Sequence, residues 1–75
     1  MRNPTQHPIV GDIFLDPAGG GSCVLVVARI SDGRIDFETY TRHAAAATGS
    51  VSYRLDAFVR ELSTDLHAAY AAERA

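Results

Sequence analysis

The near-continuous apolar run of residues 23–30 is the feature that most constrains the fold of this chain. It is rich in valine, whose branched Cβ favours extended backbone over helix, and its length suits a central β-strand. Ser31-Asp32-Gly33 follows as a short turn signal, in which glycine is free to adopt a left-handed conformation. Residues 34–42 then alternate apolar and polar side chains, as a half-buried strand does. Together these features predict a β-hairpin.

Two further short strands are predicted over residues 9–15 and 50–55, where short apolar stretches are interleaved with polar residues. After residue 55, apolar side chains recur as far as Tyr70 with the period of about 3.6 that is typical of an amphipathic helix. Ser63 or Thr64 is placed to divide this helix in two. The sequence therefore predicts a run of strands that is closed off by a C-terminal helix.

A chain of 75 residues is long enough for one domain with one core. Residues 1–8 are mostly polar and contain Pro4 and Pro8, so they are predicted to form a flexible N-terminal lead-in. Residues 9–66 form the predicted single domain. Residues 67–75, whose packing face is mostly alanine, are predicted to be the fraying end of the helix. Pro17 and the glycines after it mark residues 16–22 as a loop.

The charge balance argues against a general nucleic-acid-binding surface. The formal net charge is −2, and all 7 basic side chains are arginine, whereas proteins that bind phosphates usually carry a basic excess. Cys23 is the only cysteine, which excludes a disulfide within the chain. No apolar stretch has the length of a membrane span, and the first residues carry no secretory signal core, so a cytoplasmic location is expected.

Short strands with short links and a glycine-rich first loop predict a strongly bent sheet that protects its edges by curling into a partial barrel. Residues 11–17, 24–30, 34–37 and 55–58 resemble small SH3-like barrel proteins encoded by prophages and other mobile elements. The resemblance implies a mainly β (α+β) fold, with about four to five antiparallel strands in a partly open SH3-like barrel and a C-terminal helix. It also implies a phage or mobile-element origin.

Residues 49–51, followed by Leu55 and Ala57, also resemble the last strand and turn of type II dihydrofolate reductases. These are plasmid-borne SH3-like chains that assemble as tetramers around one pore. That family follows the valine with Gln-Ile-Tyr, which lines the pore. This sequence has Ser52, Tyr53 and Arg54 there, and it has no lysine to help hold the cofactor phosphates. A reductase is therefore only a remote alternative.

The outward side of the second hairpin strand is the predicted binding surface. Tyrosine and arginine are common at the hot spots of protein interfaces, because each has a large apolar surface and a polar group at its end. Arg29 is expected on the neighbouring strand. A solvated face with ion pairs between strands is the alternative interpretation of the same residues. The predicted binding residues are Arg34, Asp36, Glu38, Tyr40, Arg42 and Arg54.

No recognisable catalytic, metal or cofactor motif accompanies this surface. The glycines of residues 19–22 are followed by a strand and by no lysine, unlike a phosphate-binding loop. The 3 histidines and Cys23 are far apart in the sequence, whereas metal ligands are usually closely spaced. Cys23 begins an apolar run, which is typical of a small buried side chain. We therefore expect no enzyme activity, no metal and no cofactor.

The main hypothesis is a small non-catalytic binding protein of a phage or mobile element that acts by stoichiometric contact with a protein partner. Inhibition of a host defence complex, as by anti-CRISPR proteins, is one form of such contact. The alternative is a nucleic-acid-binding SH3-like module that uses Arg29, Arg34, Arg42 and Arg54. A homodimer stays open as well, because a chain this short gains apolar burial by pairing. No membrane partner is expected.

Overall fold

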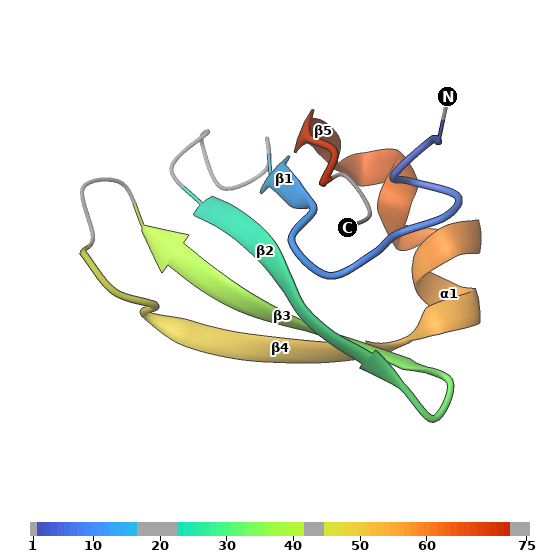
Figure 1. Cartoon of the computed structure of the whole chain (residues 1–75), viewed down its shortest axis with the longest axis horizontal. Coiled ribbons are helices and arrows are strands. Elements are labelled where there is room, and N and C mark those ends of the chain that lie inside the picture. Colours follow the sequence, from blue (N-terminus) through green and yellow to red (C-terminus); the bar gives the residue numbers. More distant parts are fainter. Residues whose placement is uncertain (1, 17–22, 42–44, 73–75) are drawn as a thin grey trace.

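The computed structural model describes residues 2–16, 23–41 and 45–72 of the chain. They form one antiparallel sheet of five strands in the spatial order β4-β3-β2-β1-β5, with one short helix and one 3-10 turn (Figure 1). β4 and β5 are the two edges, so the sheet bends without closing. This confirms a small, mainly β fold with little helix.

The central hairpin of β2 (Cys23–Ser31) and β3 (Arg34–Thr41) is confirmed. Ser31 pairs with Arg34 across a turn in which Asp32 and Gly33 have φ angles of 54° and 73°. Positive φ at both central residues defines a type I′ turn, whose twist matches that of the paired strands. Glycine adopts this conformation freely, and aspartate is among the few other residues that tolerate it. The Asp-Gly pair therefore explains the register of the hairpin.

The two outer predicted strands are also present, and one is shorter than expected. β4 (Gly49–Arg54) pairs with β3, close to the predicted residues 50–55. β1 (Ile13–Asp16) pairs with β2 but begins only at Ile13 instead of residue 9. Gly11 has a φ of 98°, and the amide of Asp12 donates to the carbonyl of Ile9 at 3.1 Å. The chain therefore makes a turn at Gly11 before it can enter the sheet.

The predicted C-terminal helix is present only in its first part, and the prediction for residues 66–70 is wrong. α1 (Leu55–Arg60) is a helix and η2 (Leu62–Asp65) is a 3-10 turn, but β5 (His67–Tyr70) is a strand that pairs antiparallel with β1. Without β5, β1 would be an edge strand with unpaired backbone groups. This tertiary pairing overrides the helical spacing of the apolar side chains.

Two hydroxyl groups end the helical segment. Ser63 Oγ donates to the carbonyl of Val59 at 2.9 Å, and Thr64 Oγ donates to the carbonyl of Glu61 at 2.7 Å. Such bonds compete with the backbone pattern of an α-helix and favour a turn. The interruption that the sequence indicated here is therefore present, but the chain that follows it is extended.

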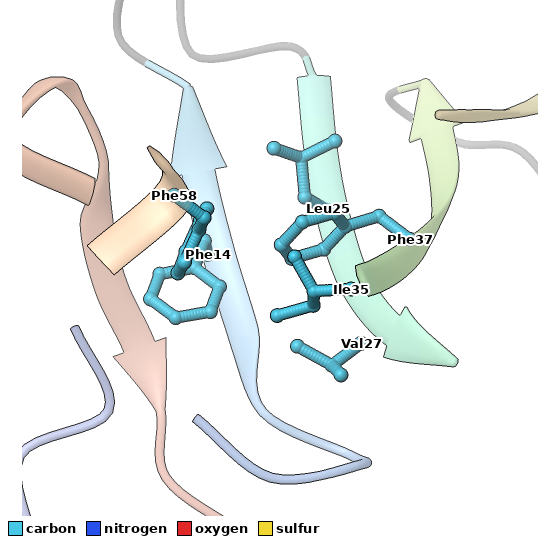
Figure 2. Close-up of a cluster of buried hydrophobic side chains, with 6 residues drawn as sticks. All are labelled: Phe14, Leu25, Val27, Ile35, Phe37 and Phe58. Carbon is cyan, nitrogen blue, oxygen red and sulfur yellow. The ribbon is translucent and has the colours of Figure 1, made fainter. Parts of the chain in front are cut away.

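The core lies between the bent sheet and α1. Phe14, Phe37 and Phe58 are fully buried, and their rings meet edge-on or tilted, with centroids 5.2 to 6.2 Å apart (Figure 2). Burial of one such side chain stabilises the fold by about 1.5 to 3 kcal/mol. Since Phe58 belongs to α1, these contacts hold the helix against the sheet. The other buried apolar residues are Leu25, Val27 and Ile35.

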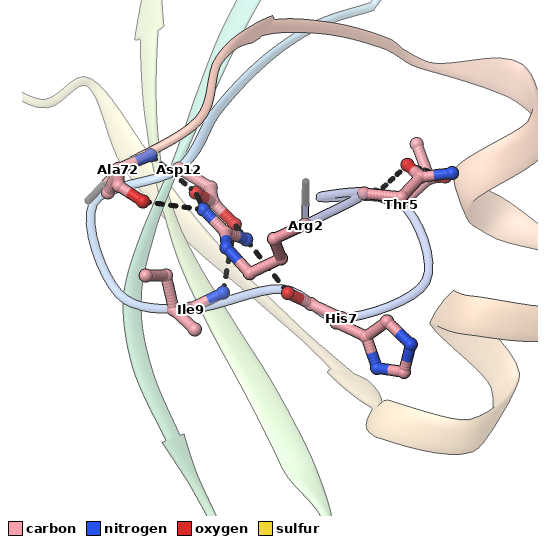
Figure 3. A network of polar contacts seen from close by, with 7 residues as sticks. Arg2, Thr5, His7, Ile9, Asp12 and Ala72 are labelled. Atoms are coloured by element: carbon pink, nitrogen blue, oxygen red, sulfur yellow. Dashed lines mark hydrogen bonds and ion pairs between the residues drawn. The ribbon is translucent and has the colours of Figure 1, made fainter. Parts of the chain in front are cut away.

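Arg2 ties the predicted flexible lead-in to the rest of the domain (Figure 3). Its guanidinium donates two hydrogen bonds of 2.7 Å to the Asp12 carboxylate and one of 2.7 Å to the carbonyl of Ala72. Asp12 is fully buried and also accepts the amides of Ile9 and Ala72, both at 2.8 Å. We call these four residues the Asp12 clip. It joins the segment before β1 to the segment after β5.

The Asp12 clip favours the charged form of its carboxylate. Burial alone would raise the pKa of the Asp12 carboxyl, but hydrogen bonds from Arg2, Ile9 and Ala72, together with the charge of Arg2, outweigh it. The pKa of Asp12 is therefore lowered, and the same hydrogen bond raises the pKa of Arg2. Every polar side-chain atom that is buried in the described part of the chain has a hydrogen-bond partner.

Candidate functional site

The sheet has a second face, which the core does not use. Side chains alternate between the two faces of a strand, so each strand that buries residues in the core presents others on the opposite side. We call this opposite side the outer face. None of its apolar members packs against the core cluster. The register places on it Ile13 and Leu15 from β1, Val24, Val26, Arg29 and Ser31 from β2, Arg34, Asp36, Glu38 and Tyr40 from β3, Ser50, Ser52 and Arg54 from β4, and His67 and Tyr70 from β5.

The structure brings most of the predicted binding residues together on the outer face. Those on β3 alternate with Ile35 and Phe37, which are fully buried on the inner side. Arg54 of β4 lies directly opposite Arg34 in the register. Arg42 lies outside the described residues. The predicted residues that share the outer face of β3 are Arg34, Asp36, Glu38 and Tyr40.

A β-bulge brings Arg29 onto the same face. The β2–β3 register shifts between Val27 and Arg29, so Ala28 is the extra residue. After the bulge, Arg29 pairs with Asp36 on the outer face, and Ile30 returns to the inner side and packs against the core. Without the extra residue, Arg29 would point into the core. The bulge also borders a shallow hollow of about 390 Å³ with walls from β2, β3 and β4.

The hairpin end of the outer face is charged, and serines hold two of its arginines. Arg29 Nε donates to Ser31 Oγ at 3.0 Å, and Arg34 Nε donates to Ser52 Oγ at 3.1 Å. The terminal guanidinium nitrogens of both arginines have no partner among the described residues. These nitrogens form the fork that can bind a carboxylate through two parallel hydrogen bonds. We call Arg29, Arg34, Asp36, Glu38 and Arg54 the charged half.

Arg34 and Arg54 lie opposite each other, a pairing of like charges that costs stability. Arg54 Nη2 is 3.1 Å from Asp56 Oδ2, and the two side chains are 72% and 57% exposed. An ion pair this exposed contributes less than about 1 kcal/mol. Within the described ranges, the Arg34 guanidinium has no acidic partner. A carboxylate from another molecule would therefore relieve the repulsion between the two arginines.

Tyr40 lies at the boundary between the charged half and the rest of the outer face. Its hydroxyl donates to Glu38 Oε2 at 2.9 Å. This hydrogen bond raises the pKa of the Tyr40 hydroxyl, with further contributions from burial and from the charge of Glu38. On the other side, Tyr40 pairs with Val24 of β2. Tyr40 therefore contacts the Glu38 carboxylate through its hydroxyl and lies beside the apolar Val24.

The other end of the outer face is apolar, and it was not predicted. Val24 and Val26 lie opposite Leu15 and Ile13 of β1, and Ile13 also lies opposite Tyr70, which is 55% exposed. The signal was available in β2, because a strand that is apolar at successive positions has two faces to cover. The core covers only one of them. We call Ile13, Leu15, Val24, Val26, Tyr40 and Tyr70 the apolar half.

The histidine and cysteine residues that could bind a metal or take part in catalysis do not form a cluster among the described residues. Among the described residues, no group of three histidine, cysteine, aspartate or glutamate side chains could hold a metal ion. Cys23 is partly buried and packs against the core, whereas His7 and His67 are exposed. His43 and the glycines of residues 19–22 lie outside the described residues. None of the helices among residues 2–16, 23–41 and 45–72 is long and apolar enough to cross a membrane.

Comparisons with known proteins provide no relative from which a function could be transferred. No protein-family model matches the chain, and neither a curated protein nor a solved structure matches it. The function is therefore inferred from the outer face itself.

Proposed function

We propose that this protein is a small non-catalytic binding protein that acts by stoichiometric contact with a partner protein through its outer face. The observation that carries this proposal is the apolar half, a group of partly exposed apolar side chains that the core does not cover. Exposed apolar patches on small soluble domains mark interaction surfaces. Protein interfaces combine an apolar centre with a polar rim. The charged half supplies such a rim beside the apolar half.

The charge distribution favours a protein partner over nucleic acid. Asp36 and Glu38 lie on the same face as Arg29, Arg34 and Arg54, so the face carries charges of both signs. A phosphate backbone would be repelled by the two carboxylates and would gain nothing from the apolar half. A protein surface with its own carboxylates and apolar side chains complements both halves. Nucleic-acid binding through the arginines is the second candidate.

The strand order supports a closer description of the fold as a partly open SH3-like barrel. Strands β1 to β4 are successive neighbours, and β5 returns after a helical segment to the other side of β1. We further propose a phage or mobile-element origin, from the sequence resemblance to small SH3-like proteins of such elements. The partner would then belong to a host process, such as a defence complex that the protein inhibits.

The proposal is tested by comparing an outer-face variant with a matched control. Val26→Lys places a charge in the apolar half opposite Glu38, which can pair with the new ammonium and so preserve the fold. Gln6→Lys adds the same charge at an exposed position of the N-terminal segment, outside the outer face. Each form is immobilised and exposed to an extract of the natural host. We expect the wild type and Gln6→Lys to capture one partner protein and Val26→Lys not to capture it.

The captured partner is then purified and its affinity is measured by titration calorimetry. We expect one partner per chain and a dissociation constant at least about tenfold weaker for Val26→Lys, as for a central interface residue. Equal affinity for all three forms would show that the outer face is not the binding site.

Gel shifts with mixed DNA and RNA test the second candidate. Nucleic-acid binding through the charged half should weaken steeply as salt increases and should be lost in the double variant Arg34→Ala/Arg54→Ala. Such a result would replace the protein partner with a nucleic acid. Absence of binding at low salt would dismiss this candidate.

A further inference from the structure

A second hollow lies on the inner side of the sheet, between the edge strand β4 and the segment that contains η2. Its volume of about 360 Å³ falls within the range of roughly 300 to 1,000 Å³ that is typical of small-molecule pockets. We call this hollow the inner pocket.

The inner pocket opens onto the core. Leu25 and Phe58, both buried core residues, form part of its lining. Its other apolar residues are partly buried and pack against the core: Tyr53 of β4, Leu62 at the start of η2, and Leu66 directly after η2. In the described part of the chain, β4 pairs only with β3, so no strand fills this side. An apolar group that enters here would extend the core.

The polar part of the lining is acidic. Asp16 at the end of β1 and Asp65 at the end of η2 line the inner pocket, and none of the described basic residues does. Asp65 is exposed, and no hydrogen bond or ion pair of its side chain is found within residues 2–16, 23–41 and 45–72. The pocket therefore combines an apolar interior with an exposed carboxylate, that of Asp65, at its rim, which attracts cations.

We propose that the inner pocket binds an organic cation with an apolar body, such as an aryl or alkyl ammonium ion. The apolar body contacts Tyr53, Leu62 and Leu66, and the ammonium group pairs with Asp65 at the rim. An anion is repelled by the Asp65 carboxylate, and a neutral ligand of the same shape lacks the ion pair. The site lies on the opposite side of the sheet from the outer face, so this proposal does not depend on the proposed function.

Three probes of similar size test the charge preference: 2-phenylethylammonium, 2-phenylethanol and phenylacetate. Each is titrated into isotope-labelled protein and followed by NMR. The ammonium should saturably shift the amide signals of Leu25, Tyr53, Phe58 and Leu62, with a dissociation constant on the order of 1 mM. The alcohol should bind about three- to fivefold more weakly, the contribution of one exposed ion pair, and phenylacetate should bind more weakly still. Shifts confined to other residues, or equal binding of ammonium and alcohol, would overturn the proposal.

Variants at exposed carboxylates assign the effect to the inner pocket. Asp65→Asn should weaken ammonium binding about three- to fivefold and leave the alcohol unchanged. Asp65→Lys should weaken ammonium binding more than Asp65→Asn does, because it replaces attraction with repulsion. Glu61→Gln, which removes an exposed carboxylate outside the pocket, is the matched control and should bind all probes as the wild type does. If Asp65→Asn and Glu61→Gln lose the same affinity for the ammonium, the effect comes from the net charge of the protein, and the assignment to the inner pocket is overturned.

Val26→Lys separates this test from that of the outer face. It should bind 2-phenylethylammonium as tightly as the wild type, because Val26 lies outside the inner pocket. If Val26→Lys no longer binds 2-phenylethylammonium, the two sites are not separate.

Discussion

The two faces of the sheet carry similar apolar side chains in different surroundings. On the inner face, Phe14 and Phe37 are fully buried, because Phe58 of α1 packs against both. On the outer face, Val24 and Val26 lie beside their cross-strand partners and stay partly exposed. The difference shows that apolar character alone does not define the core of this chain. A residue joins the core only where the chain also supplies a cover.

The largest expected effect follows from removing the ring at the centre of the inner face. Phe37 packs against Phe14, Tyr53 and Phe58, with ring centroids 6.2, 6.1 and 5.2 Å away. Phe37→Ala should lower the free energy of unfolding by about 3 to 5 kcal/mol. A chain of 75 residues has a total of roughly 4 to 11 kcal/mol, so the variant should be close to unfolding. Urea unfolding followed by circular dichroism measures this, and a loss below about 1 kcal/mol would contradict the assignment of Phe37 to the core.

Asp12→Ala should have the next largest effect. The substitution leaves the Arg2 guanidinium without its carboxylate and the amides of Ile9 and Ala72 without an acceptor. Because the Arg2 side chain is 22% exposed, the loss should lie below that of a fully buried ion pair, at about 2 to 3 kcal/mol. Urea unfolding checks the value, with Asp56→Ala as a control at an exposed carboxylate. Equal losses in the two variants would show that the clip contributes no more than a surface ion pair.

The Asp12 clip also predicts how stability depends on pH. The pKa of Asp12 is lower in the folded state, so the folded state binds this proton less tightly than the unfolded state does. The contribution of Asp12 is therefore complete above the pKa of an unfolded aspartate, about 4, and is lost as the pH falls through the folded pKa. Thermal unfolding of the wild type and Asp12→Asn should show a stability difference that shrinks as the solution is acidified. A constant difference would be evidence against this account.

Neighbouring valines on opposite faces provide a smaller and more direct comparison. Val27 is 1% exposed on the inner face, whereas Val26 lies on the outer face. Val27→Thr buries a hydroxyl group and should cost about 1 to 3 kcal/mol. Val26→Thr should change stability by less than about 0.5 kcal/mol, since a surface strand position accepts threonine. Melting temperatures of the two variants measure the contrast, and similar losses would mean that both faces are packed.

The smallest effect is expected for the exposed ion pair of the charged half. Asp56→Asn removes the partner of Arg54, and both side chains are largely exposed. The loss should be below about 0.5 kcal/mol and should vanish at high salt. Urea unfolding at two salt concentrations tests this prediction. A loss that persists in salt would indicate a role for Asp56 beyond the ion pair.

Local sequence patterns were sufficient to predict the central hairpin of the sheet. The Asp32-Gly33 pair and the alternation along β3 predicted the hairpin and the assignment of its faces, because both depend on residues close in sequence. β5 could not be found in this way, since residues 67–70 contain no β-branched side chain and become a strand only beside β1. The Asp12 clip was missed for the same reason, because Arg2 and Ala72 meet only in the folded chain.

The candidate site was predictable to a similar extent. Alternation alone predicted the outward residues of β3, and the register confirms that Arg54 lies next to Arg34. The bulge that turns Arg29 outward and the alignment of Ile13 with Val26 depend on strand pairing, which no local pattern contains. Binding of a partner at this surface stays a prediction.

The hydrogen bond from Arg2 to Ala72 spans 70 positions of the chain, which has a consequence for biosynthesis. β1 is made before its second neighbour, β5, and before the carbonyl that Arg2 binds. Closing so long a loop is slow compared with forming the central hairpin. While residues 67–72 are still inside the ribosome, the emerging chain therefore carries an open edge at β1, and this side of the sheet can be completed only after residue 72 has emerged.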